Sequence, residues 1–195
     1  MSLIQTYNEF RFLKQSGRKA AARLVAMELI RMYRDDPDPE FVFEICERCD
    51  HKIDFMIWKE LVLPVLAKGV ESNPRAIRGM IQTIQNLYSS KSDWEALAYV
   101  TEDQLTARLL TLCPGDAWAK QKRIDQLRKW LSYTIHEWPS GVLYGTDGAS
   151  IEQCDEILDV AQELRSLDEA GIFAALCDDV EQKTIQYRSR LTSNG

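Results

Sequence analysis

The apolar residues of this chain recur at spacings of three and four along almost its whole length, which is the period of an amphipathic α-helix. Helix-ending and helix-starting residues, chiefly glycine, proline and N-cap side chains, interrupt this pattern at intervals of roughly 15 to 25 residues. No segment shows the strict alternation that is typical of a strand. The pattern therefore predicts an all-α fold without a sheet, built of about nine helices in stacked antiparallel hairpins.

The ends of the expected helices follow from local signals. Thr101-Glu-Asp-Gln104 and Ser150-Ile-Glu-Gln153 have the form of capping boxes. Pro64 is expected to kink or divide the helix that contains it. The predicted helices span residues 2–15, 18–34, 39–50, 53–68, 73–88, 92–113 with a restart at Thr101, 116–138, 150–167 and 168–191.

The composition favours one domain. A chain of 195 residues, 45% of them hydrophobic, is long enough to bury one substantial core. It has only nine glycines and six prolines, and no Gly/Ser-rich tract marks a flexible linker. We expect a single all-α domain over residues 1–195, with helical hairpins in residues 1–90 and a long-helix bundle in residues 91–195 as candidate halves.

The net charge and the lack of a recognisable signal peptide limit the expected cellular location and the expected classes of partner. The 24 basic and 30 acidic residues give a net charge of -6, which argues against a broad nucleic-acid footprint. The N-terminal residues lack the apolar core of a signal peptide, and the longest apolar run, Leu61 to Ala67, is too short to span a bilayer. The five cysteines are odd in number and fit reduced thiols. We therefore expect a cytoplasmic protein without a membrane or nucleic-acid partner.

One short segment raises the question of a metal site. The segment "CERCDH" places Cys46, Cys49 and His51 within one or two helical turns. A structural zinc site needs a fourth ligand, and the remaining cysteines are scattered singly along the chain. The favoured interpretation is that these cysteines are small apolar residues at a helix end, with metal binding as the alternative.

The segment "IHEWPSGVLYGTDGAS", residues 135–150, is the best candidate for an active-site loop. His136 would act as a general base, with Glu137 or Asp147 as its carboxylate partner. Against this hypothesis, two adjacent residues on a helix diverge by about 100° and cannot easily share a ligand. Catalysis is therefore the alternative hypothesis, in the form of a hydrolase-like enzyme.

The same loop is also a candidate binding surface. Ten residues exceed what a simple reversal between helices needs, and several of them are apolar, so we expect the loop to fold back onto the helices. The next helix carries carboxylates that would form a negative face for a basic partner. The candidate binding residues are Trp138, Val142, Leu143, Tyr144, Asp147, Glu152, Asp155 and Asp159.

The first predicted hairpin resembles a tetratricopeptide-type helical repeat. In "YNEFRFLKQSGRKAAARLVAMELIRMYRDDPDP", an aromatic helix leads to Gly17, Ala22 follows five residues later, and Pro37 closes the second helix. Pro37 lies almost one turn late for that family, and no second copy returns at a period near 34 residues. The resemblance covers the N-terminal part of the chain. It implies a stacked-hairpin architecture and protein recognition rather than catalysis.

These observations favour a non-enzymatic protein–protein interaction module that needs no cofactor. A bacterial adaptor or immunity-type protein, whose acidic surface masks a basic toxin or effector, is one concrete form of this hypothesis. The partner would then be another protein, probed most directly at the loop and at the acidic helix that follows it.

Overall fold

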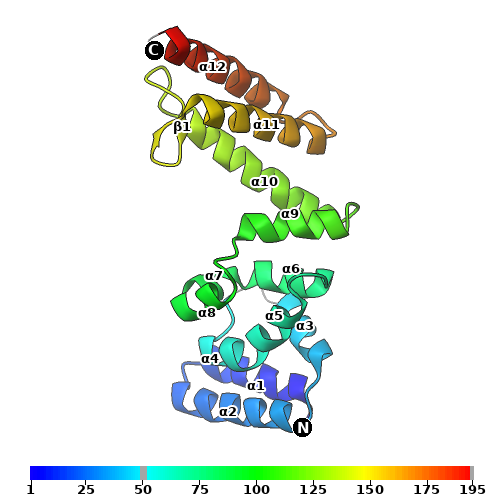
Figure 1. The fold of residues 1–195 in the computed structure, drawn as a ribbon. Helices are drawn as coiled ribbons and strands as arrows, with labels where there is room; N and C mark the ends of the chain where they lie inside the picture. Colours follow the sequence, from blue (N-terminus) through cyan, green and yellow to red (C-terminus); the bar gives the residue numbers. More distant parts are fainter. Residues whose placement is uncertain (49–51, 194–195) are drawn as a thin grey trace. The chain divides into compact units, whose positions relative to one another are not determined.

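The computed structural model describes residues 1–48 and 52–193, and it is predominantly α-helical (Figure 1). The chain divides into two compact units, unit 1 from Met1 to Pro114 and unit 2 from Gly115 to Gly195. This division lies later in the chain than the boundary at residue 90 that the sequence suggested for two halves. No helix in the described part of the chain is both long and apolar enough to cross a membrane.

Unit 1 consists of helices only, within the residues that the structure describes. Several begin at N-cap side chains, among them Ser2, Asn73 and Thr101, and the capping box predicted at Thr101 is present. Its elements are α1 (Leu3–Gln15), α2 (Lys19–Asp35), α3 (Pro39–Glu47), α4 (Phe55–Ile57), the π-helix η1 (Trp58–Val62), α5 (Leu63–Gly69), α6 (Pro74–Gln82), α7 (Ile84–Tyr88), α8 (Lys91–Ala96) and α9 (Glu102–Leu112).

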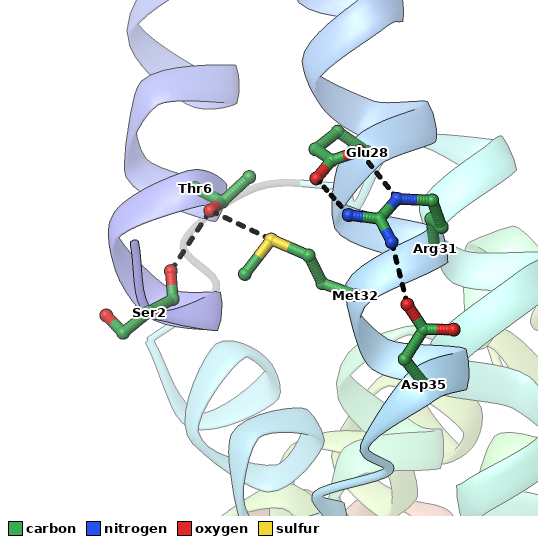
Figure 2. A network of polar contacts seen from close by, with 6 residues as sticks. All are labelled: Ser2, Thr6, Glu28, Arg31, Met32 and Asp35. Atoms are coloured by element: carbon green, nitrogen blue, oxygen red, sulfur yellow. Dashed lines mark hydrogen bonds and ion pairs between the residues drawn. The ribbon is translucent and has the colours of Figure 1, made fainter.

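Helices α1 and α2 pack against each other after a short turn at Gly17, whose φ of +75° lies in the left-handed region that glycine adopts easily. Both helices bury apolar side chains, among them Phe10 and Leu29. At the open end of the pair, the Thr6 hydroxyl donates to the Ser2 carbonyl at 3.0 Å and lies 3.6 Å from the sulfur of Met32 (Figure 2). The first predicted hairpin is thus formed.

Pro64 explains why the predicted helix 53–68 is divided. Proline has no N–H to donate, and its ring clashes with the carbonyl four residues earlier in a regular α-helix. The chain widens into the π-helix η1 just before it, where the Leu63 N–H bonds to the carbonyl of Trp58, five residues back. The segment Phe55–Gly69 therefore contains a wide turn between α4 and α5.

The core of unit 1 lies around α5 and α6. Helix α6 packs on α3, α5 and α9. The backbone at Gly69 approaches α6 so closely that an added Cβ would lie only 2.7 Å from the Cβ of Ala76, and glycine makes this approach possible. The largest fully buried side chains of unit 1 include Trp58, Leu61, Leu66, Ile77, Met80, Leu105 and Leu109.

Unit 2 consists of three long helices and a small hairpin. Helices α10 (Ala117–Thr134), α11 (Ile151–Leu167) and α12 (Ala174–Ser193) pack on one another. Their shared core contains Leu131, Ile157 and Val180. The Asp116 side chain caps α10, and the capping box predicted at Ser150 is present.

Three predicted features differ from the structure. The prediction of no sheet is wrong, because β1 (Leu143–Tyr144) pairs antiparallel with β2 (Asp147–Gly148). The helix predicted over 116–138 ends at Thr134, four residues early. The helix predicted over 73–88 is broken at Thr83, whose hydroxyl bonds the Gly79 carbonyl at 2.9 Å.

Candidate functional site

The loop 135–150 folds back onto unit 2. Its hairpin turns at Gly145, which has a φ of +65°. The Ala149 N–H donates to the Val142 carbonyl at 2.8 Å, and both side chains are buried in the core of α10, α11 and α12. Val142 therefore contributes to packing and offers no surface to a partner.

The aromatic side chains of the loop are also engaged within unit 2. The Tyr144 hydroxyl donates to the Glu156 carboxylate at 2.6 Å, and its ring packs edge-on against Trp130 with centroids 5.8 Å apart. The hydrogen bond to Glu156, followed by burial, raises the pKa of Tyr144. The Trp138 ring lies 4.7 Å from the Arg190 guanidinium. Leu143 is half-buried and pairs with Gly148 in the hairpin.

The structure brings two of the three candidate catalytic residues into contact. Because α10 ends at Thr134, His136 and Glu137 lie in a turn, and their side chains contact at 3.0 Å instead of diverging as they would on a helix. The His136 Nδ1 lies 2.6 Å from the Tyr133 carbonyl oxygen, and both partners of the pair are about half exposed. Within the described residues, the exposed Asp147 carboxylate has no hydrogen bond or ion pair to either of them.

The predicted acidic face of α11 is partly neutralised within unit 2. The Asp155 carboxylate pairs with Arg188 at 2.9 Å. Glu152 accepts a hydrogen bond from the Ser150 hydroxyl, and its pKa is lowered mainly by its own backbone N–H and by that hydroxyl. Asp159 is exposed and has no ion pair within the described residues.

The acidic residues of α12 are neutralised in the same way. Arg165 bridges Asp178 and Glu181 at 3.1 and 2.8 Å, and Lys183 holds Asp179 at 2.8 Å. Residues 115–195 contain nine basic and fourteen acidic side chains, so unit 2 carries most of the net negative charge. Its cations nevertheless compensate the carboxylates where the two helices face each other.

The structure describes one of the three residues of the hypothetical metal site. Cys46 is 1% exposed and belongs to the core of unit 1, whereas Cys49 and His51 lie outside the described residues. Among residues 1–48 and 52–193, no group of three or more His, Cys, Asp or Glu side chains is placed to hold a metal ion. Burial raises the pKa of the Cys154 and Cys177 thiols.

Unit 1 contains a feature that the sequence did not reveal, a row of three open depressions along α2. We call this row the α2 groove. The first depression, about 470 Å³, is lined by Phe10, Lys14, Lys19, Ala22, Arg23, Asp54 and Met56. The middle one, about 330 Å³, is lined by Met27, Ile30, Arg31, Arg34, Asp35, Met56 and Glu60. The third, about 680 Å³, includes Tyr33, Arg34, Pro37, Phe43, Glu60, Pro64 and Lys68.

The depressions are neighbours because they share walls. Met56 lines the first and the middle depression, and Arg34 and Glu60 line the middle and the third. Helix α2 contributes to all three depressions, and α4 and η1 pack on it. Helix α1 also lines the first depression, and α3, α5 and α6 also line the third. Two ion pairs join the sides of the groove, Lys14 with Asp54 and Arg34 with Glu60.

The cations of the α2 groove fall into two groups. Arg31 is held by Glu28 and Asp35 of the same helix, at 2.7 and 2.8 Å (Figure 2). The hydrogen bond that Arg31 donates to the Glu28 carboxylate contributes most to raising the pKa of Arg31. By contrast, Lys19, Arg23 and Lys68 are exposed and have no ion pair within the described residues.

One signal in the sequence points toward this region. Between Arg11 and Arg34 the chain has seven basic residues and one acidic residue, against a net charge of -6 for the whole. The negative net charge of the whole chain hides this local excess of basic residues. The depressions themselves depend on Met56, Glu60 and Lys68, which lie far from α2 in the sequence, and no local pattern predicts their position.

Comparisons with protein-family models, with curated proteins and with solved structures find no match to this chain.

Proposed function

We propose that this protein is a non-enzymatic protein–protein interaction module whose contact surface is the α2 groove. The observation that carries the proposal is the row of three depressions with shared walls along one exposed helix. Small-molecule sites are typically single concave pockets that bury most of their ligand. An open, elongated groove beside a helix fits a segment of another protein.

The dimensions of α2 support this choice. Its 17 residues span about 25 Å at a rise of 1.5 Å per residue. That length suits a partner helix of several turns, or an extended peptide of about seven residues. An exposed apolar side chain also favours an interface. Met27, in the middle depression, is 54% exposed.

The finer architecture belongs to the same proposal. The pairs α1–α2, α5–α6 and α11–α12 are each consecutive helices that pack on each other. This pairing favours stacked hairpins of the tetratricopeptide type, a class whose open surfaces bind proteins. A bacterial adaptor or immunity-type role is one form that such a module would take.

A photocrosslinking experiment tests the proposal. A photoreactive phenylalanine derivative replaces Met27 in the full-length protein, which is irradiated in an extract of the source cells. We expect a discrete protein adduct, identified by mass spectrometry. The matched control carries the same group at Phe12, which is 64% exposed on α1 and does not line the groove. Equal adducts at both positions, or none at Met27, would contradict the proposal.

A further inference from the structure

We propose that the α2 groove binds an acidic segment of a partner protein, with carboxylates at both ends of an apolar centre. This inference rests on the proposed function and adds the chemistry of the partner. It follows from the distribution of charge along the groove, which is positive at the two ends and paired in the middle.

The two ends of the groove carry cations that nothing else in the described chain neutralises. Lys19 and Arg23 line the first depression, and Lys68 lines the third. All three are exposed and without an ion pair within residues 1–48 and 52–193. Carboxylates of a partner placed over these ends would make the charge-assisted contacts that the chain itself leaves unmade.

The middle of the groove has a different chemistry. Its floor contains Ile30 and the two methionines Met27 and Met56. Methionine is flexible and polarizable, and it is frequent at binding surfaces that adapt to apolar partners. Its charged residues are paired, Arg34 with Glu60 and Arg31 with Asp35. An apolar side chain of the partner therefore fits this depression better than a further charge.

The same charge pattern favours a protein segment over a nucleic acid. A nucleic-acid strand carries phosphates at regular intervals along its whole length. In the middle depression the cations Arg31 and Arg34 are already paired with Asp35 and Glu60, so a phosphate there would gain no unpaired cation. A peptide fits this pattern because it can alternate carboxylates with apolar side chains.

The sign of the charge also separates this site from unit 2. There several carboxylates of α11 and α12 have cationic partners, namely Arg188, Arg165 and Lys183. In the α2 groove, the cations Lys19, Arg23 and Lys68 have no ion pair within residues 1–48 and 52–193. The groove is therefore a site for an acidic partner, in contrast to the basic partner that the net charge suggested.

Peptide selection on the full-length protein tests the inference. A random 12-residue peptide library is displayed on phage and selected on immobilised protein, and the enriched peptides are measured by fluorescence anisotropy. We expect peptides with acidic residues on both sides of apolar ones. Arg23→Glu should weaken their binding by about tenfold or more, and added salt should weaken it further. Met27→Ala should weaken it by about tenfold.

Two variants provide matched controls. Arg11→Glu makes the same charge change on α1 but does not line the groove, and Leu24→Ala removes a side chain that is 69% exposed on α2 outside the groove. Both should change the affinity by less than about twofold. Circular dichroism checks that every variant keeps its helical content.

The remaining outcomes contradict either the acidic partner alone or both proposals. Basic or uncharged peptides whose binding depends on Met27 would overturn the acidic partner and leave the proposed function standing. If no enriched peptide depends on Met27, both proposals fail. A labelled single-stranded RNA of 20 nucleotides is measured in parallel, and RNA binding that Arg23→Glu abolishes, without peptide binding, would assign the cations to nucleic acid.

Discussion

Thr184 and Thr134 are both buried in unit 2, and they differ in what their hydroxyl groups contact. The Thr134 hydroxyl donates to the Leu131 carbonyl at 2.8 Å, whereas the Thr184 hydroxyl has no hydrogen-bond partner within the described residues. A buried polar group without a partner lowers stability, and a partnered one raises it modestly. Two substitutions of the same kind should therefore have opposite effects.

We predict that Thr184→Val raises the free energy of unfolding by about 1 kcal/mol, because valine has nearly the same shape and no hydroxyl to desolvate. Thr134→Val should lower it by about 1 kcal/mol, since its hydrogen bond is lost. Urea unfolding followed by circular dichroism measures both. A loss of stability in both variants would show that the Thr184 hydroxyl is satisfied in solution.

Asp93 is a carboxylate whose ionised form the fold stabilises. The hydrogen bond from the Ser90 hydroxyl, together with Lys59 at 3.2 Å, holds the pKa of Asp93 below its ordinary value of 3.8, although burial opposes them. A lowered pKa in the folded state contributes stability at pH values above the unfolded pKa. That contribution is lost as the pH falls through the folded pKa.

Asp93→Asn should therefore be less stable than the wild type at pH 7, and the difference should shrink as the pH falls below about 4. Urea unfolding at a series of pH values measures this difference. Glu95→Gln, on the same helix, is the control, because Glu95 has no ion pair within the described residues. A difference that stays constant down to pH 2 would rule out the proposed pKa shift.

At the scale of the elements, the close approach of α5 and α6 leaves no room for a side chain at Gly69. A Cβ at Gly69 would meet the Cβ of Ala76 at 2.7 Å and that of Asn73 at 3.1 Å. Neither atom can move away without its backbone. Gly69→Ala should therefore lower the free energy of unfolding by about 1–3 kcal/mol.

Gly115→Ala is the matched control for Gly69→Ala. No heavy atom lies within 4 Å of a Cβ at Gly115, so its effect should stay within about 0.5 kcal/mol. Chemical denaturation measures both variants. Similar losses at the two positions would show that the effect at Gly69 is a backbone effect and not a steric one.

Helix starts could be predicted from the sequence because a cap forms between residues three apart. The capping boxes predicted at Thr101 and Ser150 are each closed by a side chain within the same turn. The break at Thr83 could not be predicted, because the apolar residues keep their helical spacing through it in the sequence. The site was hardest to predict, since Met56 meets Met27 only after α4 has packed on α2.

At the scale of the whole molecule, the chain consists of two compact units, and unit 2 has a core of its own. That core includes Leu127, Leu131, Ile157 and Leu164, all at most 4% exposed. Residues 115–195 are numerous enough to fold alone when an apolar core of this kind is present. The independence of this unit can be tested directly.

We predict that a fragment of residues 115–195 is helical by circular dichroism and unfolds cooperatively on heating. A fragment of residues 135–195 should be largely unfolded, because it lacks α10 and with it Ile124, Leu127 and Leu131. If the longer fragment is also unfolded, the two units depend on each other for stability.

The π-helix η1 has a consequence for which side chains the α2 groove presents. A π turn contains one residue more than an α turn. Glu60, which lies within η1, pairs with Arg34 across the groove. Removing one residue from Trp58–Val62, so that the segment returns to α-helical register, would therefore change which side chain it presents to Arg34.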